Sequence, residues 1–147
     1  MHMTVTLASL SQQTGLPVLD HLEQAVSIPV LDGLWAQGDL IVIPFDLLAP
    51  AVRLLPEPVW KDVPGEGVEL LRSASGGNPH TLVADPGTCR WTTSVQDFHR
   101  LALGVFACTA PAYLLHPEHG ATGCVPGTYA VRRQREREGR RARLVAD

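Results

Sequence analysis

Residues 76–93, GGNPHTLVADPGTCRWTT, contain the pattern that decides the fold. Two turn signals, Gly76-Gly77-Asn78-Pro79 and Asp85-Pro86-Gly87, each precede a short run rich in apolar and β-branched residues. Glycine, proline and asparagine favour turns, and short runs with Val, Thr and Trp favour strands. The stretch therefore predicts two short strands, over 80–85 and 88–93, joined by a tight turn.

The same pattern of a turn followed by an apolar run recurs through most of the chain. Glycine and proline together account for 25 of the 147 residues, which indicates many turns and short elements. Further strands are predicted over 40–45, 68–74, 101–109, 112–116 and 128–134. We therefore expect a mainly β fold, a small barrel or jelly-roll-like sandwich of about six to eight short strands.

Two segments give a weaker signal for strands. Residues 46–62 contain three prolines, which predict a long irregular connection or an edge strand. Residues 97–102 are typical of a short helical turn.

In residues 128–133, alternation places Tyr129 and Val131 on one face of the predicted strand and Ala130 and Arg132 on the other.

The N-terminal part of the chain has a different periodicity. Between about residues 4 and 27, apolar residues recur at three- and four-residue spacing, and Pro17 suits the first turn of a helix. The residues that carry this helix signal are Val18, Leu19, Leu22, Ala25 and Val26. The sequence therefore predicts an N-terminal helical segment over 1–30, a β-domain over 31–134 and an Arg-rich tail over 135–147.

Composition and termini favour a cytoplasmic protein. Hydrophobic residues make up 45% of the chain, a value typical of a globular domain. The N-terminus has no basic segment followed by a sustained apolar run, so no secretory signal is predicted. The longest uncharged stretch, 101–115, is shorter than the roughly 20 residues that span a bilayer. Cys89, Cys108 and Cys124 form no C-x-x-C pair, so we expect buried free thiols in a reducing compartment.

Charge is distributed unevenly along the chain. Residues 1–131 have a net charge of −7, whereas residues 132–147 contain seven arginines and have a net charge of +4. Arginines within 132–143 could neutralise phosphates of a nucleic acid. Glu136 and Glu138 lower the positive charge of this segment, however, and the tail has no aromatic residue to stack on bases. The alternatives are a solvated extension and docking of the tail on an acidic partner, such as a second copy of this chain in a homo-oligomer.

The stretch LLHPEHG, residues 114–120, is the densest cluster of side chains that can bind a metal. The residue before a proline favours extended backbone, so His116 is predicted to end a strand. Pro117 suits the second position of a turn whose ends lie within about 7 Å of each other. The turn would therefore bring the imidazoles of His116 and His119 together, and both could reach one ion at about 2.0–2.1 Å.

A metal site needs a further ligand, and His80 is the best candidate because it also lies at a strand end. Asn78 and Glu118 are candidate oxygen ligands or ligand-binding residues, and Glu118 could instead orient an imidazole or act as a base. The predicted cofactor is a divalent ion such as Zn, Mn, Fe or Ni. The alternatives are a histidine-lined site without metal and an ordinary surface turn, since His, Pro, Glu and Gly are common in such turns.

The Gly-rich turn before His80 and the His116-Pro117-Glu118-His119 turn, followed by Pro126-Gly127, resemble the cupin superfamily over residues 76–131. The resemblance implies a small jelly-roll barrel that holds one metal on histidines and a carboxylate. This chain departs from the usual His-x-His pattern of cupins, because Asn78 stands where a first histidine would be expected beside His80. The stretches QGDLIVIPFD, GGNPHTLVAD and YLLHPEHGATGCVPGTYAVRRQRE also resemble small uncharacterised bacterial proteins.

These patterns predict a pocket for a metal or small ligand, lined by His80, His116, Glu118 and His119. The competing hypothesis is a non-enzymatic protein that assembles through its β-domain and its Arg-rich tail. The sequence leaves open whether the protein is an enzyme, since it contains no phosphate-binding glycine loop and no Ser-His-Asp order.

Overall fold

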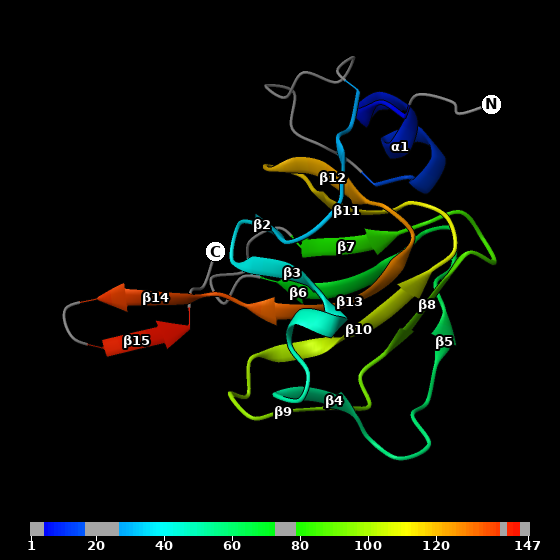
Figure 1. Ribbon diagram of the computed structural model, residues 1–147. Helices are drawn as coiled ribbons and strands as arrows, with labels where there is room; N and C mark the ends of the chain where they lie inside the picture. Colours follow the sequence, from blue (N-terminus) through cyan, green and yellow to red (C-terminus); the bar gives the residue numbers. More distant parts are fainter. Residues whose placement is uncertain (1–4, 17–26, 73–78, 139–140, 145–147) are drawn as a thin grey trace.

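The predicted strands assemble into two sheets that pack face to face, which confirms a mainly β, sandwich-like fold (Figure 1). The computed structural model describes residues 5–16, 27–72, 79–138 and 141–144. Within these residues the two sheets do not close into a barrel. None of the helices in the described part of the chain has the length and apolar character needed to cross a membrane.

The first sheet has five strands in the order β1-β12-β11-β7-β6. Its strands are β1 (Val30–Leu31), β12 (Gly120–Cys124), β11 (Ala112–His116), β7 (Pro79–Val83) and β6 (Val68–Arg72). Only the pairing of β1 with β12 is parallel. Strand β11 lies at the centre, so the residue that ends it is flanked on both sides by neighbouring strands.

The second sheet has six strands in the order β2-β3-β13-β10-β8-β5. Its strands are β2 (Trp35–Gln37), β3 (Leu40–Pro44), β13 (Gly127–Arg133), β10 (Ala102–Cys108), β8 (Cys89–Thr92) and β5 (Lys61–Asp62). All of its pairings are antiparallel. Strands β2 and β3 form a hairpin with Gly38 at φ 57°, a conformation that glycine adopts more readily than residues with a Cβ.

The main core lies between the two sheets. It includes Leu40 and Val42 from the second sheet and Leu82 and Leu114 from the first. Tyr129 and Val131 face this core, whereas Ala130 and Arg132 face the opposite side of the second sheet, so the predicted alternation of β13 is confirmed. Burial of these apolar side chains is the main term that holds the sandwich together.

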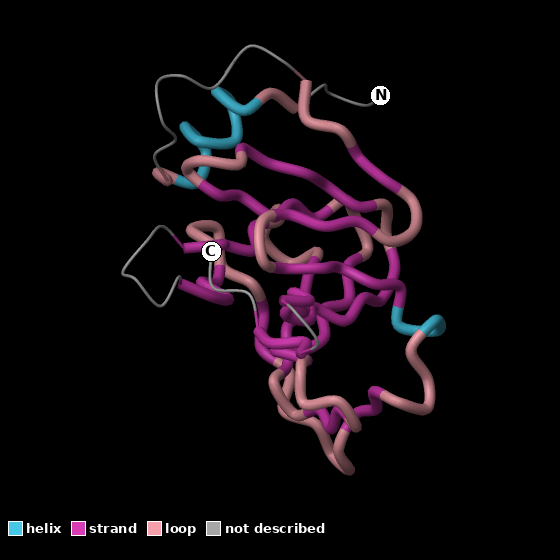
Figure 2. Tube along the Cα trace, turned by 90° about the vertical axis from the view of Figure 1, so that its left-hand side faces the viewer, coloured by secondary structure: helices cyan, strands magenta, loops and turns pink. Residues whose placement is uncertain are grey.

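The outer face of each sheet is also covered. The helix α1 (Leu7–Thr14) packs Leu7 and Leu10 against Val83 and Leu115 of the first sheet. Figure 2 shows the helix outside the strands at one end of the molecule. Thr6 and Ser9 form a capping box that starts the helix, which lies within the predicted helical segment 1–30. The residues that carried the helix prediction, 17–26, lie outside the described residues.

The outer face of the second sheet is covered by a small two-stranded sheet, at the lower end of the molecule in Figure 1. It pairs β4 (Val52–Leu54) with β9 (Val95–Asp97), and Val52 is buried against Val105 and Ala130. The segment 46–62, predicted as a long irregular connection or an edge strand, contains most of the short 3₁₀ helix η1 (Phe45–Leu47) and all of β4 and β5, and β5 lies at an edge of the second sheet. Residues 97–100 form a single turn in which Arg100 N donates to Asp97 O.

The Arg-rich tail forms a hairpin of β14 (Arg135–Glu138) and β15 (Arg141–Leu144), which projects from the side of the sandwich (Figure 1). With this hairpin and several strands of two or three residues, the chain has more strand segments than the sequence predicts. Such short segments are too brief to produce a periodic pattern. Their pairing depends on the strands that the fold places beside them.

The three cysteines are distant in sequence but meet in the main core, where all are buried free thiols, as predicted. Cys89 pairs in register with Cys108 across β8 and β10. Burial, together with the neighbouring Cys108, raises the pKa of the Cys89 thiol to about 12. The Cys89 thiol therefore stays protonated and unreactive while the protein is folded.

Candidate functional site

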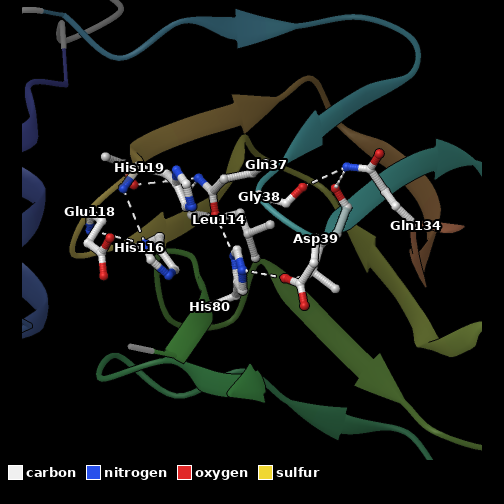
Figure 3. A network of polar contacts seen from close by, with 11 residues as sticks. Gln37, Gly38, Asp39, His80, Leu114, His116, Glu118, His119 and Gln134 are labelled. Carbon is white, nitrogen blue, oxygen red and sulfur yellow. Dashed lines mark hydrogen bonds and ion pairs between the residues drawn. The ribbon is translucent and has the colours of Figure 1, made fainter. Parts of the chain in front are cut away.

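The three predicted imidazoles lie together at one end of the first sheet (Figure 3). The ring of His116 lies 4.4 Å from the ring of His80 and 4.4 Å from the ring of His119, measured between centroids. The rings of His80 and His119 are nearly parallel and 6.1 Å apart. We call these three side chains the histidine cluster.

The local structure of the 116–119 turn follows the prediction. Strand β11 ends at His116, and residues 117–119 form the turn to β12. Within the turn, Nδ1 of His116 accepts hydrogen bonds from the backbone N–H groups of Glu118 at 3.0 Å and His119 at 3.2 Å. The imidazole therefore holds the turn closed, and its ring proton lies on Nε2.

Strand register brings His80 to this turn. Leu115 pairs with Thr81 across β11 and β7, so the next rung places His116 opposite His80. His80 and His116 are both buried, whereas the side chain of His119 is exposed. The histidine cluster thus runs from the interior to the surface.

Two residues that the sequence analysis did not single out hold His80 in place. Its Nδ1 lies 2.9 Å from Oε1 of Gln37, and its Nε2 lies 2.9 Å from Oδ1 of Asp39. Gln37 also donates through Nε2 to the backbone oxygen of Leu114 at 2.9 Å, which sets the orientation of its amide. Because Gln37 ends β2 and Asp39 lies in the β2–β3 turn, this network joins the second sheet to the first.

The partners of His80 determine its charge. A neutral imidazole has one nitrogen that donates and one that accepts. When Asp39 is ionised, both nitrogens of His80 face oxygen atoms that only accept, and hydrogen bonds at both then require the doubly protonated imidazolium. Asp39 then forms a buried ion pair with His80, in which the two side chains are 2% and 1% exposed. A buried charge is tolerated when it is paired and hydrogen-bonded in this way.

A metal ion fits this arrangement poorly. Both nitrogens of His80 and Nδ1 of His116 are engaged in hydrogen bonds, so they offer no lone pair to an ion without rearrangement. Across the described residues, no group of three or more His, Cys, Asp or Glu side chains is arranged to hold a metal. The metal site at His80, His116 and His119 therefore stays a prediction.

The two remaining predicted residues have different outcomes. Glu118 lies in the turn with its side chain exposed, so it borders the histidine cluster from the solvent side. Asn78 lies outside the described residues. The signal for Gln37 and Asp39 was present in the sequence as polar residues around Gly38, directly before the apolar run 40–44, but such a pattern also describes an ordinary hairpin turn.

The chain belongs to the family described as Domain of unknown function (DUF8820), whose family model matches residues 36–134. The match begins in β2, one residue before Gln37, and ends after β13, so it covers nearly all of the second sheet, every strand of the first sheet except β1, and every member of the histidine cluster. No curated protein and no solved structure matches the chain. The resemblance to cupins receives no support from these comparisons.

Proposed function

Since membership of this family carries no assigned activity, we propose a function from the site itself: the histidine cluster binds a small oxyanion, such as a carboxylate or phosphate. The observation that carries the proposal is the convergence of three imidazoles, in which the buried ring of His116 lies 4.4 Å from the exposed ring of His119. Free thiols buried in the core suit a reducing compartment, so we infer a cytoplasmic setting.

The ring protons support an anion as ligand. The proton of His116 lies on Nε2, because Nδ1 accepts two backbone N–H groups. His119 adds a further N–H group at the exposed end, 4.4 Å from His116. Hydrogen bonds from imidazole or imidazolium to an oxyanion are charge-assisted and therefore stronger than bonds between neutral groups.

Calorimetric titration with inorganic phosphate and with acetate tests the proposal. The variant His119→Ala removes the exposed ring, and we expect it to weaken anion binding by about tenfold. The control is Lys61→Ala, which removes an exposed cationic side chain on β5 of the second sheet and should leave the affinity unchanged. Absence of anion binding, or equal binding by wild type and His119→Ala, would overturn the proposal. Glu118→Gln should strengthen binding by removing a negative charge beside the site.

A divalent metal is the competing ligand, as the cupin resemblance implies. For a metal to bind, the ring of His80 would have to leave Gln37 or Asp39. Titration with Zn²⁺ alone distinguishes the two ligands. Binding of one Zn²⁺ per chain that is lost in His119→Ala would replace the anion proposal by a metal site.

Assembly through the tail is a second candidate function, favoured by the hairpin that projects from the sandwich. Removal of the chain after Gln134 would delete the hairpin but keep β13 intact. Light scattering at two salt concentrations should then show a smaller particle than the full chain at low salt, because the arginines of the tail attract an acidic surface. An assembly state that ignores both truncation and salt would exclude this function.

A further inference from the structure

We propose that the groove beside the β4–β9 pair is a second binding site, which takes a small planar aromatic anion such as a nucleoside monophosphate. The groove has a volume of about 540 Å³, within the range of about 300–1,000 Å³ that is typical of small-molecule sites. It lies at the end of the molecule opposite α1 (Figure 1). It contains none of the residues of the histidine cluster and is independent of the oxyanion proposal.

The strand pairing places the lining residues on one face. Arg53 pairs with Gln96 across β4 and β9. The pairing continues beyond the strands, since Phe98 N donates to the backbone oxygen of Ala51. Because side chains alternate along a strand, Arg53, Gln96 and Phe98 share the outward face, while Val52 between them is fully buried on the other face.

Phe98 is the most exposed large apolar side chain of those described, at 82%. The turn from Asp97 to Arg100 holds it at the rim of the groove, and the ring of His99 contacts it at an interplanar angle of 85°. Such a contact leaves a face of the phenyl ring open to a planar ligand. An aromatic ring stacked there would cover apolar surface that is otherwise in water.

Two cations, Arg53 and Arg100, line the same groove. Neither guanidinium forms an ion pair with any residue of the described chain, and both side chains are exposed. Arg100 has φ 59°, in the left-handed region that residues other than glycine rarely adopt. The turn thus places the Arg100 side chain at the groove while its own backbone is strained. Backbone strain of this kind is frequent at ligand sites.

The one carboxylate in the groove does not cancel these charges, because it is already neutralised. Both oxygens of Asp97 accept hydrogen bonds from Arg132, at 3.1 and 3.3 Å. The same oxygens also accept the backbone N–H groups of His99, Leu101 and Ala102. With Asp97 compensated, the groove has a net positive charge that suits a phosphate or carboxylate.

The two arginines and the phenyl ring together determine the class of ligand. Guanidinium groups bind phosphate and carboxylate oxygens through paired N–H donors, and a phenyl ring stacks on a base. A ligand that carries both an anionic group and a planar ring would engage all three side chains. Inorganic phosphate or an uncharged nucleoside would engage only part of the site.

The test titrates the full chain with AMP, adenosine and inorganic phosphate. The titrations use the His119→Ala background, so that anion binding at the histidine cluster is weakened. We expect AMP to bind more tightly than either of the other two probes. Arg53→Gln and Arg100→Gln should each weaken AMP binding by about tenfold, and Phe98→Ala should weaken it by a similar factor.

Matched controls separate the site from general charge effects. Arg90→Gln removes an exposed arginine that stacks on Trp60 outside the groove, and Leu47→Ala removes an exposed apolar side chain elsewhere. Both should bind AMP as the parent protein does. Equal affinities for AMP and phosphate would overturn the proposal, as would binding of a single-stranded oligonucleotide without binding of AMP. Because the groove shares no residue with the histidine cluster, failure of one proposal leaves the other to its own test.

Discussion

Two buried carboxylates, Asp39 and Asp97, stabilise different parts of the molecule in different ways. Asp39 lies in the β2–β3 turn and pairs with His80 across the two sheets. Asp97 ends β9 and pairs with Arg132 on the outer face of the second sheet, where it also accepts three backbone N–H groups. Both side chains are almost fully buried, so burial alone does not distinguish them.

The difference lies in what each partner can do when its carboxylate is lost. Arg132 keeps its charge at any pH that proteins encounter, so it would remain as an unpaired cation. His80 can release a proton and become neutral. The Asp97 centre therefore keeps a charged partner when its carboxylate is lost, whereas the Asp39 centre does not.

The largest expected effect is that of Asp97→Ala. The substitution removes the partner of Arg132 and the acceptor of three backbone N–H groups, so we expect a loss of about 3–5 kcal/mol in the free energy of unfolding. Urea denaturation followed by circular dichroism measures it. Asp62→Ala is the matched control, because Asp62 is exposed on β5, and it should change stability by less than about 0.5 kcal/mol. A loss as small as that of the control would contradict the role given to Asp97.

Asp39→Ala should cost less, about 2–3 kcal/mol, because His80 can become neutral when its partner is removed. The same denaturation experiment applies. Nuclear magnetic resonance of the imidazole nitrogens should show both nitrogens of His80 protonated in the wild type and only one in the variant. If Asp39→Ala were as destabilising as Asp97→Ala, or if His80 were neutral in the wild type, the contrast between the two centres would be lost.

Gln37→Leu tests the second partner of His80. The substitution leaves Nδ1 of His80 and the backbone oxygen of Leu114 without their hydrogen bonds from this side chain, so we expect a loss of about 1–2 kcal/mol. Gln96→Leu on the exposed face of β9 is the control and should be nearly neutral. Equal stability of the two variants would show that Gln37 does not hold His80 in place.

The smallest expected effect is the acid dependence of stability at Asp97. Burial acts to raise the pKa of Asp97, but the backbone N–H groups of His99 and Leu101 and the charge of Arg132 outweigh it and lower the pKa below its ordinary value. The unfolded chain, in which the pKa of Asp is about 3.9, therefore binds the proton more readily. The contribution of Asp97 is complete well above pH 4 and is lost as the pH falls through the folded-state value.

Urea denaturation of the wild type and Asp97→Asn between pH 7 and pH 3 measures this dependence. The stability difference between the two proteins should shrink on acidification, by less than the full effect of Asp97→Ala, because a protonated carboxyl still accepts hydrogen bonds. A difference that stays constant, or grows toward low pH, would contradict the lowered pKa.

Most of the long strands were predictable from the sequence, since their apolar runs and turn residues are local signals. The predicted strands over 40–45, 80–85, 88–93 and 112–116 agree with β3, β7, β8 and β11 to within a few residues. The two-residue strands β1 and β5 were not predictable, because so short a segment has no periodicity of its own. The choice of sandwich over barrel was also open, since it depends on which strand edges pair.

The histidine cluster shows the same division between local and long-range information. The proline turn placed His116 and His119 together from local geometry alone, and this part of the prediction agrees with the structure. Gln37 and Asp39 lie about 40 residues away from His80 along the chain, and no local rule links them. Their contact exists only because the β2–β3 hairpin of one sheet faces β7 of the other.

The sequence by itself determined a mainly β chain with short strands, three buried thiols, an Arg-rich tail and a turn that gathers two imidazoles. These properties follow from turn chemistry, alternation and composition, which act over a few residues. Only the tertiary structure decided which oxygen atoms surround His80, and with them its charge, and only it gathered Arg53, Phe98 and Arg100 around one groove. Hydrogen-bond partners and charge compensation depend on atoms a few ångströms apart in space, and sequence order does not encode that proximity.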